Sequence, residues 1–340
     1  MSLSILVIHT GGTIGMVREP NTETLKPLNF DALYHHLPVL ENFGYRIEFT
    51  TFHPLLDSSD MNPSFWVELA TVIEAHYDSV DGFVVLHGSD TMAYTASALS
   101  FMLENLDKPV IFTGSQLPIG MVRTDARENF VNSVEIAAAR EGGVPIVPEV
   151  AICFDNKLFR GNRTSKFNAE HFSAFVSGNF PLLAEVGVSI RYNRSLILQP
   201  GSEKLKVHRQ LDRNIAILKI FPGITRDVVR AILHTEHLKA VILETFGSGN
   251  APTASWFLGE LKKAHQRGIL LFNVTQCKGG VVEIGKYATS AELGKIGVVG
   301  GYDITTESAV TKLMYLLGCG FPREEVEQLL QTPLRGEMTV

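Results

Sequence analysis

The amino-acid sequence predicts an α/β protein with two domains. The larger, N-terminal one is a three-layer α/β/α domain with a mainly parallel sheet, and the C-terminal one is a smaller α/β domain. Short apolar runs rich in β-branched residues alternate with longer segments of helical periodicity. Such runs are typical of parallel strands buried on both faces, and the alternation places helices over both faces of the sheet. The chain of 340 residues is also long for a single core, which favours two domains.

The expected strands and helices follow from these patterns in chain order. Strands are expected at 4–9, 47–52, 82–87, 110–113, 150–154, 215–220, 240–245 and 269–274. Helices are expected at 64–77, 91–106, 125–140, 253–267 and 307–317. The segment 191–212 contains Pro200 and Gly201 and no long apolar run, so it is interpreted as one or two strands leading into a linker. The domains are therefore expected at 1–200 and 213–340.

Composition narrows the class of protein. The net charge of −6 argues against a nucleic-acid or anionic-membrane surface, since both attract clustered Lys and Arg. The three cysteines are far apart, which predicts neither a zinc site nor a disulfide framework. The N-terminus has no basic region before its short apolar run, and no stretch reaches the length of a membrane span. A cytoplasmic location is expected.

Three expected strands end in the same way, with glycine and a hydroxyl residue. The first continues into Thr10-Gly11-Gly12-Thr13, the second into Gly88-Ser89-Asp90, and the third into Gly114-Ser115. In open α/β sheets, ligands bind at the carboxyl ends of the strands. Glycine lets backbone N–H groups approach a ligand, and a following helix N-terminus favours negative charge.

Each of these turns also has a purely structural interpretation. Thr13 and Asp90 could simply be N-terminal residues of helices, because Thr and Asp are common caps. His87 is interpreted as a packed residue at a strand end rather than a base. A nucleotide cradle fits poorly, because the glycines do not form GxGxxG and no GK[ST] follows.

Two further polar clusters follow expected strands. Asp57-Ser58-Ser59-Asp60 comes after the strand at 47–52, and its alternative role is helix capping. The segment from Arg160 to Lys166 comes after the strand at 150–154. Basic loops are usually solvated surface, but this one is expected at the same sheet edge as the hydroxyls.

Six motifs, in this order, make the chain similar to the bacterial-type L-asparaginase family, and it looks most like the cytosolic type I branch. They are Ile8-His9-Thr10-Gly11-Gly12-Thr13-Ile14-Gly15, Asp57-Ser58-Ser59-Asp60-Met61, His87-Gly88-Ser89-Asp90-Thr91-Met92, Thr113-Gly114-Ser115-Gln116, Arg160-Gly161-Asn162-Arg163-Thr164-Ser165-Lys166 and Gly247-Ser248-Gly249-Asn250-Ala251-Pro252. The resemblance spans nearly the whole chain. It implies the two-domain fold, a homodimer or homotetramer, L-asparagine as substrate, and neither metal nor cofactor.

The resemblance also implies a catalytic mechanism. Thr13 would attack the side-chain amide carbon of asparagine and form an acyl-enzyme. A threonine hydroxyl is a weak nucleophile and needs a neighbouring base. Ser89, Asp90 and Lys166 would handle the proton, and a lysine serves as a base only when desolvation favours its neutral form.

Substrate binding is assigned by the same resemblance. Asp57, Ser58 and Ser59 would hold the α-amino and α-carboxylate groups, and Asp90 would also bind the α-ammonium group. Backbone N–H groups near Ser89 and Ser115 are candidates for the oxyanion hole.

The chain departs from the family pattern at three places. Ser89 stands where threonine is usual, and the loop 16–29, which is expected to be a mobile lid, contains no tyrosine. Glu244 occupies the region where relatives with a regulatory asparagine site have arginine. Two other functions remain open at this stage. One is the amidase subunit of a tRNA-dependent amidotransferase, and the other is a non-catalytic small-molecule-binding α/β protein.

Overall fold

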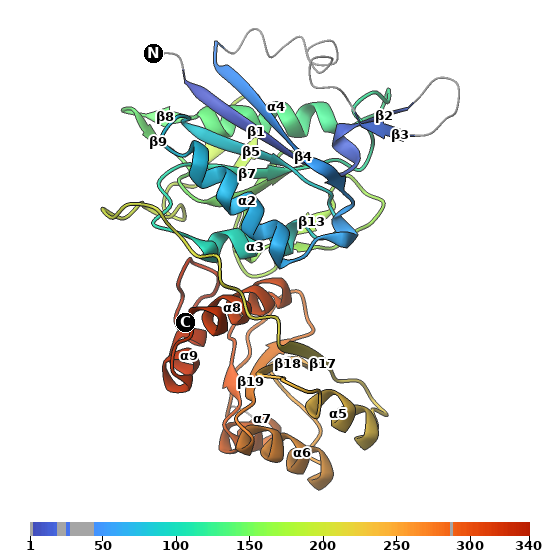
Figure 1. Cartoon of the computed structure of the whole chain (residues 1–340). Helices are drawn as coiled ribbons and strands as arrows, with labels where there is room; N and C mark the ends of the chain where they lie inside the picture. Colours follow the sequence, from blue (N-terminus) through green and yellow to red (C-terminus); the bar gives the residue numbers. More distant parts are fainter. Residues whose placement is uncertain (1–2, 19–24, 28–43, 286–287) are drawn as a thin grey trace. The chain divides into compact units, whose positions relative to one another are not determined.

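The chain folds into two compact units, each with its own sheet (Figure 1). The computed structural model describes residues 3–18, 25–27, 44–285 and 288–340. The larger unit comprises Met1–Val176 and Pro181–Arg209, and the smaller unit comprises Ser177–Phe180 and Gln210–Val340.

The larger unit is built on an eight-stranded sheet with the order β15-β14-β11-β10-β7-β5-β1-β4. Its strands are β1 (Ser4–Gly11), β4 (Arg46–Leu56), β5 (Gly82–Leu86), β7 (Val110–Thr113), β10 (Val150–Phe154), β11 (Lys157–Arg160), β14 (Ala184–Val186) and β15 (Ile190–Tyr192). The five strands from β4 to β10 are parallel, and β11, β14 and β15 continue the sheet antiparallel. Strands β1, β5, β7 and β10 are buried along their whole length, which explains their unbroken apolar sequences.

Helices cover both faces of this sheet. Helix α4 (Ala126–Ala138) packs on β1, β5, β7 and β10, while α2 (Pro63–His76) and α3 (Met92–Met102) lie on the other side (Figure 1). Short strand pairs complete the unit: β2 (Met16–Arg18) with β3 (Leu25–Pro27), β6 (Leu103–Glu104) with β16 (Lys206–Val207), β8 (Arg140–Glu141) with β9 (Val144–Pro145), and β12 (Ser165–Lys166) with β13 (Phe175–Val176).

The smaller unit contains a four-stranded parallel sheet with the order β17-β18-β19-β20. Its strands are β17 (Ile215–Lys219), β18 (Ala240–Thr245), β19 (Leu270–Thr275) and β20 (Val299–Gly300). Its helices are α5 (Arg226–Leu233), α6 (Ser255–Gln266), α7 (Ala288–Ile296), α8 (Thr306–Cys319) and α9 (Arg323–Leu330). A core around Leu243, Phe257 and Leu261 joins α5 and α6 to the sheet.

The predicted fold class is confirmed, and so are all the expected strands and all five expected helices. Helix α3 ends at Met102 rather than at residue 106, because the chain turns into β6 there. Helices α5, α7 and α9, each of eight or nine residues, were missed, although α5 and α9 have one apolar and one polar face. Of the predicted lid at 16–29, the strands β2 and β3 are described, and the rest lies outside the described residues.

Candidate active site

The carboxyl ends of four neighbouring parallel strands carry most of the predicted site residues. In the sheet, β1 lies between β4 and β5, and β7 lies beyond β5. Thr13 follows β1, Asp57 follows β4, Ser89 follows β5 and Ser115 follows β7. Because parallel strands end at one edge, residues that are up to about a hundred positions apart in sequence come to the same side of the sheet.

Two glycines let these loops touch one another directly. Gly12 has φ 85°, and a Cβ there would lie 2.5 Å from the backbone nitrogen of Gly88. A Cβ on Gly88 would in turn lie 2.5 Å from Ser58 Oγ. Only residues without a side chain permit such approaches, so the loops after β1, β4 and β5 are packed backbone against backbone or side chain.

Lys166 meets Ser89 and Asp90 at this edge. Its Nζ donates a hydrogen bond to Ser89 Oγ at 2.8 Å and another to the Asp90 carboxylate. The Lys166 side chain is 17% exposed, whereas the Asp90 side chain is 66% exposed and faces solvent. This charge-assisted cluster can orient the Ser89 hydroxyl and pass a proton across it.

The segment that presents Lys166 is buried, so its interpretation as a solvated basic loop is wrong. Arg160 and Arg163 are 4% and 3% exposed. The chain leaves β11 at Arg160, makes a single 3₁₀ turn at Gly161–Arg163, and enters β12. A basic residue can be buried here because Arg160 pairs with Glu149, at 2.7 Å between Nε and Oε2.

His87 is a packed residue, as its position at a strand end indicated. Its side chain is fully buried, with Nδ1 2.7 Å from the Gly88 carbonyl oxygen and Nε2 2.9 Å from Thr95 Oγ1. Trp66 Nε1 donates to the same Thr95 hydroxyl, which leaves that hydroxyl to donate to Nε2 of a neutral imidazole. Burial lowers the pKa of His87 to about 4, so the imidazole is neutral and only a weak base near neutral pH.

Asp57 caps the 3₁₀ turn Ser58–Asp60, which is the structural role that the sequence also allowed. Asp57 Oδ1 accepts from the backbone nitrogen of Ser59 at 2.9 Å and from Ser59 Oγ at 2.8 Å. The Ser59 backbone bond is the main reason that the pKa of Asp57 lies below its usual value. Ser58 is buried, and its carbonyl oxygen accepts from Thr91 Oγ1 at 2.6 Å. Asp57 stays exposed, so capping leaves it accessible to a ligand.

Thr13 and Ser115 are placed differently. Thr13 is half-buried and begins a 3₁₀ turn, Thr13–Gly15. Within the described part of the chain, no hydrogen bond joins its hydroxyl to Ser89, Asp90 or Lys166. The Ser115 hydroxyl donates to the carbonyl oxygen of Leu117 at 2.6 Å, so this side chain holds its own loop.

Comparison with known proteins identifies the family. The model of the asparaginase N-terminal domain matches residues 4–198, and that of the glutaminase/asparaginase C-terminal domain matches residues 214–330. The chain belongs to the asparaginase family. It is 46% identical to L-asparaginase 1 of Escherichia coli strain K12, over 99% of this chain and 98% of that protein.

Two further relatives of this asparaginase-family chain bear names for different activities. A crystal structure of L-asparaginase I from Vibrio cholerae matches with a TM-score of 0.90 and 41% identity, over 100% of both chains. The 60 kDa lysophospholipase of Mus musculus is 43% identical over 99% of this chain, which corresponds to 62% of that longer protein. The resemblance drawn from the six motifs is thus confirmed.

Sequence reasoning missed the residues that hold the Ser115 loop of this family member. The Asp125 carboxylate accepts from the backbone nitrogens of Gln116 and Leu117, and Asn129 Nδ2 donates to the Gly114 carbonyl oxygen at 3.0 Å. Both lie at the start of α4, where the sequence suggested only a helix boundary. The sole local signal was an aspartate preceding an amphipathic segment.

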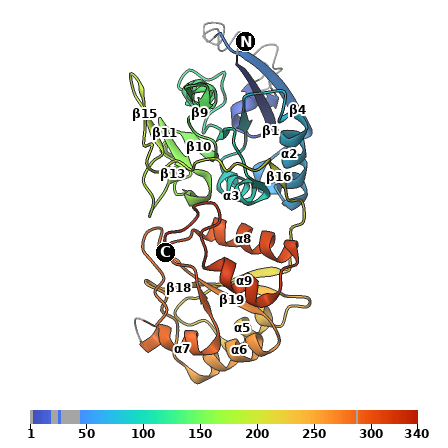
Figure 2. The same cartoon turned by 90° about the vertical axis from the view of Figure 1, so that its left-hand side faces the viewer.

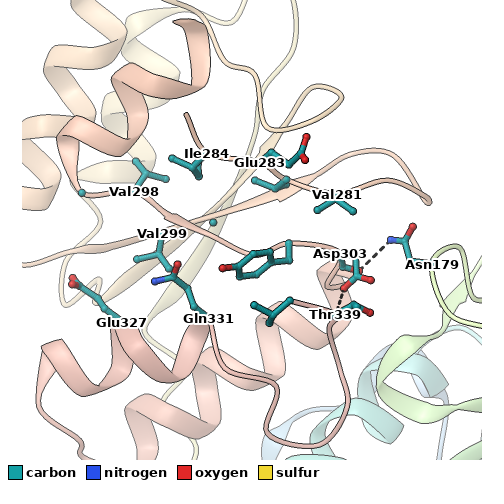
Figure 3. A pocket seen from close by; sticks show the side chains of 15 residues that line it. Asn179, Val281, Glu283, Ile284, Val298, Val299, Asp303, Glu327, Gln331 and Thr339 are labelled. Atoms are coloured by element: carbon teal, nitrogen blue, oxygen red, sulfur yellow. Dashed lines mark hydrogen bonds between the residues drawn. The ribbon is translucent and has the colours of Figure 1, made fainter. Parts of the chain in front are cut away.

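The smaller unit contains a separate cavity of about 870 Å³ (Figure 3). Valines and Ile284 form much of its lining, with Tyr302, Glu283 and Asp303 among the polar residues. None of the sequence-predicted catalytic or substrate-binding residues lines it. Among the described residues, no group of three or more His, Cys, Asp or Glu side chains could hold a metal ion, and no helix is long and apolar enough to cross a membrane.

Proposed function

We propose that this chain is an L-asparaginase, which hydrolyses the side-chain amide of L-asparagine to L-aspartate and ammonia. The observation that carries the proposal is the contact of Lys166 with Ser89 and Asp90 at the sheet edge reached by Thr13. Similarity over nearly the full length of L-asparaginase 1 supports the same reaction.

In the proposed mechanism Thr13 is the nucleophile. Its Oγ1 forms an ester bond with the side-chain carbonyl carbon, the C–N bond breaks, and the hydroxyl proton ends on the departing ammonia. Water then adds to the ester carbon and the bond from that carbon to Thr13 Oγ1 breaks. The hydroxyl of the water stays on the aspartate, and its other proton returns to Thr13 Oγ1. The Thr13 proton passes through Ser89 Oγ to Lys166 Nζ, 2.8 Å away, which must be neutral to accept it, and from there to the departing ammonia.

The remaining site residues bind the substrate and the oxyanion. We assign the α-ammonium group to the exposed carboxylates of Asp57 and Asp90, and the α-carboxylate to Ser58 and Ser59. Backbone N–H groups at Ser89 and Ser115 would face the oxyanion, where each such donor contributes about 3 kcal/mol in other enzymes. Asp125 and Asn129 fix the Ser115 loop for this purpose.

The two other functions considered from the sequence are less well supported. A tRNA-dependent amidotransferase subunit would need a surface for nucleic acid, and the net charge of −6 does not favour one. A non-catalytic binding protein would not need a lysine directed at a serine hydroxyl next to a nucleophile candidate.

Ammonia release from L-asparagine, D-asparagine and L-glutamine tests the proposal, with lysophosphatidylcholine hydrolysis as a further arm because of the relative that bears that name. Thr13→Ala should abolish turnover while Thr13→Ser keeps part of it. Lys166→Met should lower turnover by several orders of magnitude, whereas Lys157→Met should not, because Lys157 pairs with Asp155 outside the site. A wild-type protein that releases no ammonia from L-asparagine would refute the function.

We further propose domain bounds of 1–200 and 213–340, a homodimer or homotetramer, and a cytoplasmic location. The larger compact unit ends at Arg209 and the smaller one continues from Gln210, which supports a domain boundary near these residues. Light scattering of the purified protein would give its mass relative to the 37.4 kDa chain. A monomer at assay concentration would contradict the assembly.

A further inference from the structure

Lys166 lies on a strand that is too short to hold it in place alone. Strand β12 (Ser165–Lys166) pairs with β13 (Phe175–Val176) in a separate two-stranded sheet, and each strand has only two residues. Isolated strand pairs of this kind are marginally stable. The position of Lys166 Nζ therefore depends on the segment that leads into β12.

That segment begins at a buried ion pair. Arg160 ends β11, and Glu149 immediately precedes β10, the antiparallel neighbour of β11 (Figure 2). Arg160 Nε donates to Glu149 Oε2 at 2.7 Å, and Nη2 donates to Oε1 at 3.3 Å. Both side chains are 4% exposed, so the fork is held away from water.

The pair also binds the backbone of a third segment. Arg160 Nη2 donates to the Leu196 carbonyl oxygen at 2.5 Å, and the Leu198 nitrogen donates to Glu149 Oε1 at 2.9 Å. Two planar charged groups with these directed contacts fix the end of β11 in direction as well as in position.

A buried turn transmits this placement from Arg160 to Lys166. The Thr164 hydroxyl donates to the Arg160 carbonyl oxygen at 2.7 Å. Residues 161–165 are all buried, and the turn packs against α3, the helix that begins just after Asp90. Two residues beyond Thr164, Lys166 reaches Ser89 Oγ.

We propose that Glu149 and Arg160 are positioning residues, whose ion pair holds the turn in the arrangement that brings Lys166 Nζ to Ser89. The inference rests on the proposed function for its catalytic consequence. A buried ion pair is often no more stabilising than apolar side chains of similar size, so stability alone does not account for it. Placement of Lys166 does account for the pair, because a displacement of about 1 Å at a catalytic group can cost about 100-fold in rate.

The experiment compares Glu149→Met, Arg160→Met and the double variant with wild type, by melting temperature and by kcat and KM for L-asparagine. Each single change leaves a buried charge unpaired and should lower both melting temperature and kcat. The double variant should recover most of the melting temperature, while kcat stays at least about 30-fold low and KM changes less than about threefold. Recovery of kcat together with melting temperature would overturn the proposal.

Two controls make the result specific. Lys312→Met with Glu337→Met removes the buried pair of the smaller unit, in which both side chains are 0% exposed, and should leave kcat unchanged. Arg160→Lys keeps the charge but loses the fork, so it tests the proposal even if the double variant does not fold. It should fold and lose about tenfold in kcat; wild-type kcat in this variant would count against positioning.

A labelling measurement separates this inference from the proposed function. The rate at which an amine-acylating reagent modifies Lys166, followed by mass spectrometry, should rise in Arg160→Lys, while that of Lys157 stays constant. This readout needs no activity. Unchanged labelling would refute positioning even in an active enzyme, and faster labelling in an inactive protein would refute only the function.

Discussion

Ser89 shows how a single hydroxyl is placed by charge. Its Oγ accepts from Lys166 Nζ at 2.8 Å, and Lys166 is held on its other side by Asp90. This position requires an oxygen next to Asp90, whereas the methyl group that distinguishes threonine is not required by any contact of the cluster.

Two substitutions at position 89 test this interpretation. Ser89→Thr should keep ammonia release within roughly tenfold of wild type, about 1.4 kcal/mol of barrier, because only the stiffer χ1 of threonine is added. Ser89→Ala should lose far more, because no oxygen remains to accept from Lys166. Steady-state kinetics on L-asparagine decides between them, and an Ala variant as active as wild type would mean that the second hydroxyl is misassigned.

Two buried histidines make stability depend on pH. Burial lowers the pKa of His9 and of His87 to about 4, against 6.5 for an exposed histidine. Between pH 6.5 and pH 4 the unfolded chain binds protons that the folded chain does not. The free energy of unfolding should therefore fall as the pH drops through this window, by about 2 kcal/mol per histidine between pH 7 and pH 5.

His87→Asn isolates one of these contributions. The asparagine amide nitrogen can take the place of Nδ1 and donate to the Gly88 carbonyl oxygen, but it does not titrate. Urea unfolding between pH 7 and pH 5 gives the number of protons that the chain binds when it unfolds. This number should be smaller by about one in the variant than in wild type. If the variant keeps the wild-type dependence, His87 is not the titrating group.

At the scale of elements, the site depends on how closely the strand-end loops approach one another. The loops after β1, β4 and β5 meet at Gly12, Ser58 and Gly88. Locally, each loop is a short turn at a strand end: a 3₁₀ turn follows β1 and another follows β4, while α3 follows β5. The ligand-binding edge arises only when adjacent strands bring the loops into contact.

Gly88→Ala tests this packing. The added Cβ would lie 2.5 Å from Ser58 Oγ and 2.6 Å from Ser58 Cβ, so we expect a loss of about 1–3 kcal/mol in the free energy of unfolding. Adding Ser58→Gly should restore part of it, because the clashing atoms are removed. Gly259→Ala, which meets no atom within 4 Å in helix α6, should not destabilise. Additive effects of the Gly88 and Ser58 changes would contradict the contact.

At the scale of the whole molecule, each unit contains a buried ion pair of its own. In the smaller unit, Lys312 of α8 pairs with Glu337 at 2.6 Å and donates to the Thr332 carbonyl oxygen at 2.7 Å. Glu337 also accepts from the Leu334 and Arg335 nitrogens at 3.0 and 2.7 Å. Lys312 thus holds the C-terminal segment through Glu337 and the Thr332 carbonyl oxygen.

Lys312→Met should reveal whether the two units unfold independently. It leaves the Glu337 charge buried without its partner, which typically costs about 3–5 kcal/mol. Hydrogen exchange should then accelerate in α8 and the C-terminal segment and stay unchanged in β1 and β5. Equal acceleration in both sheets would mean that the whole chain unfolds as one cooperative unit.

The sequence by itself determined the strands and longer helices, because apolar runs and helical periods report burial locally. It also placed the hydroxyl residues of the candidate site at strand ends, since glycine followed by Thr or Ser marks such an end in the chain itself. It did not predict the short helices α5, α7 and α9 or the strands β11 and β14. The one or two strands expected in 191–212 correspond to β15 and β16.

Only the tertiary structure decided how these parts combine. Lys166 reaches Ser89 across 77 positions of sequence, and it does so because β11 turns back on β10 and a buried turn follows. The basic segment that local composition assigns to the surface is buried, because Arg160 finds Glu149 and the carbonyl oxygen of Leu196. These contacts join residues that are remote in sequence, and no local pattern encodes the partner that makes burial of a charge favourable.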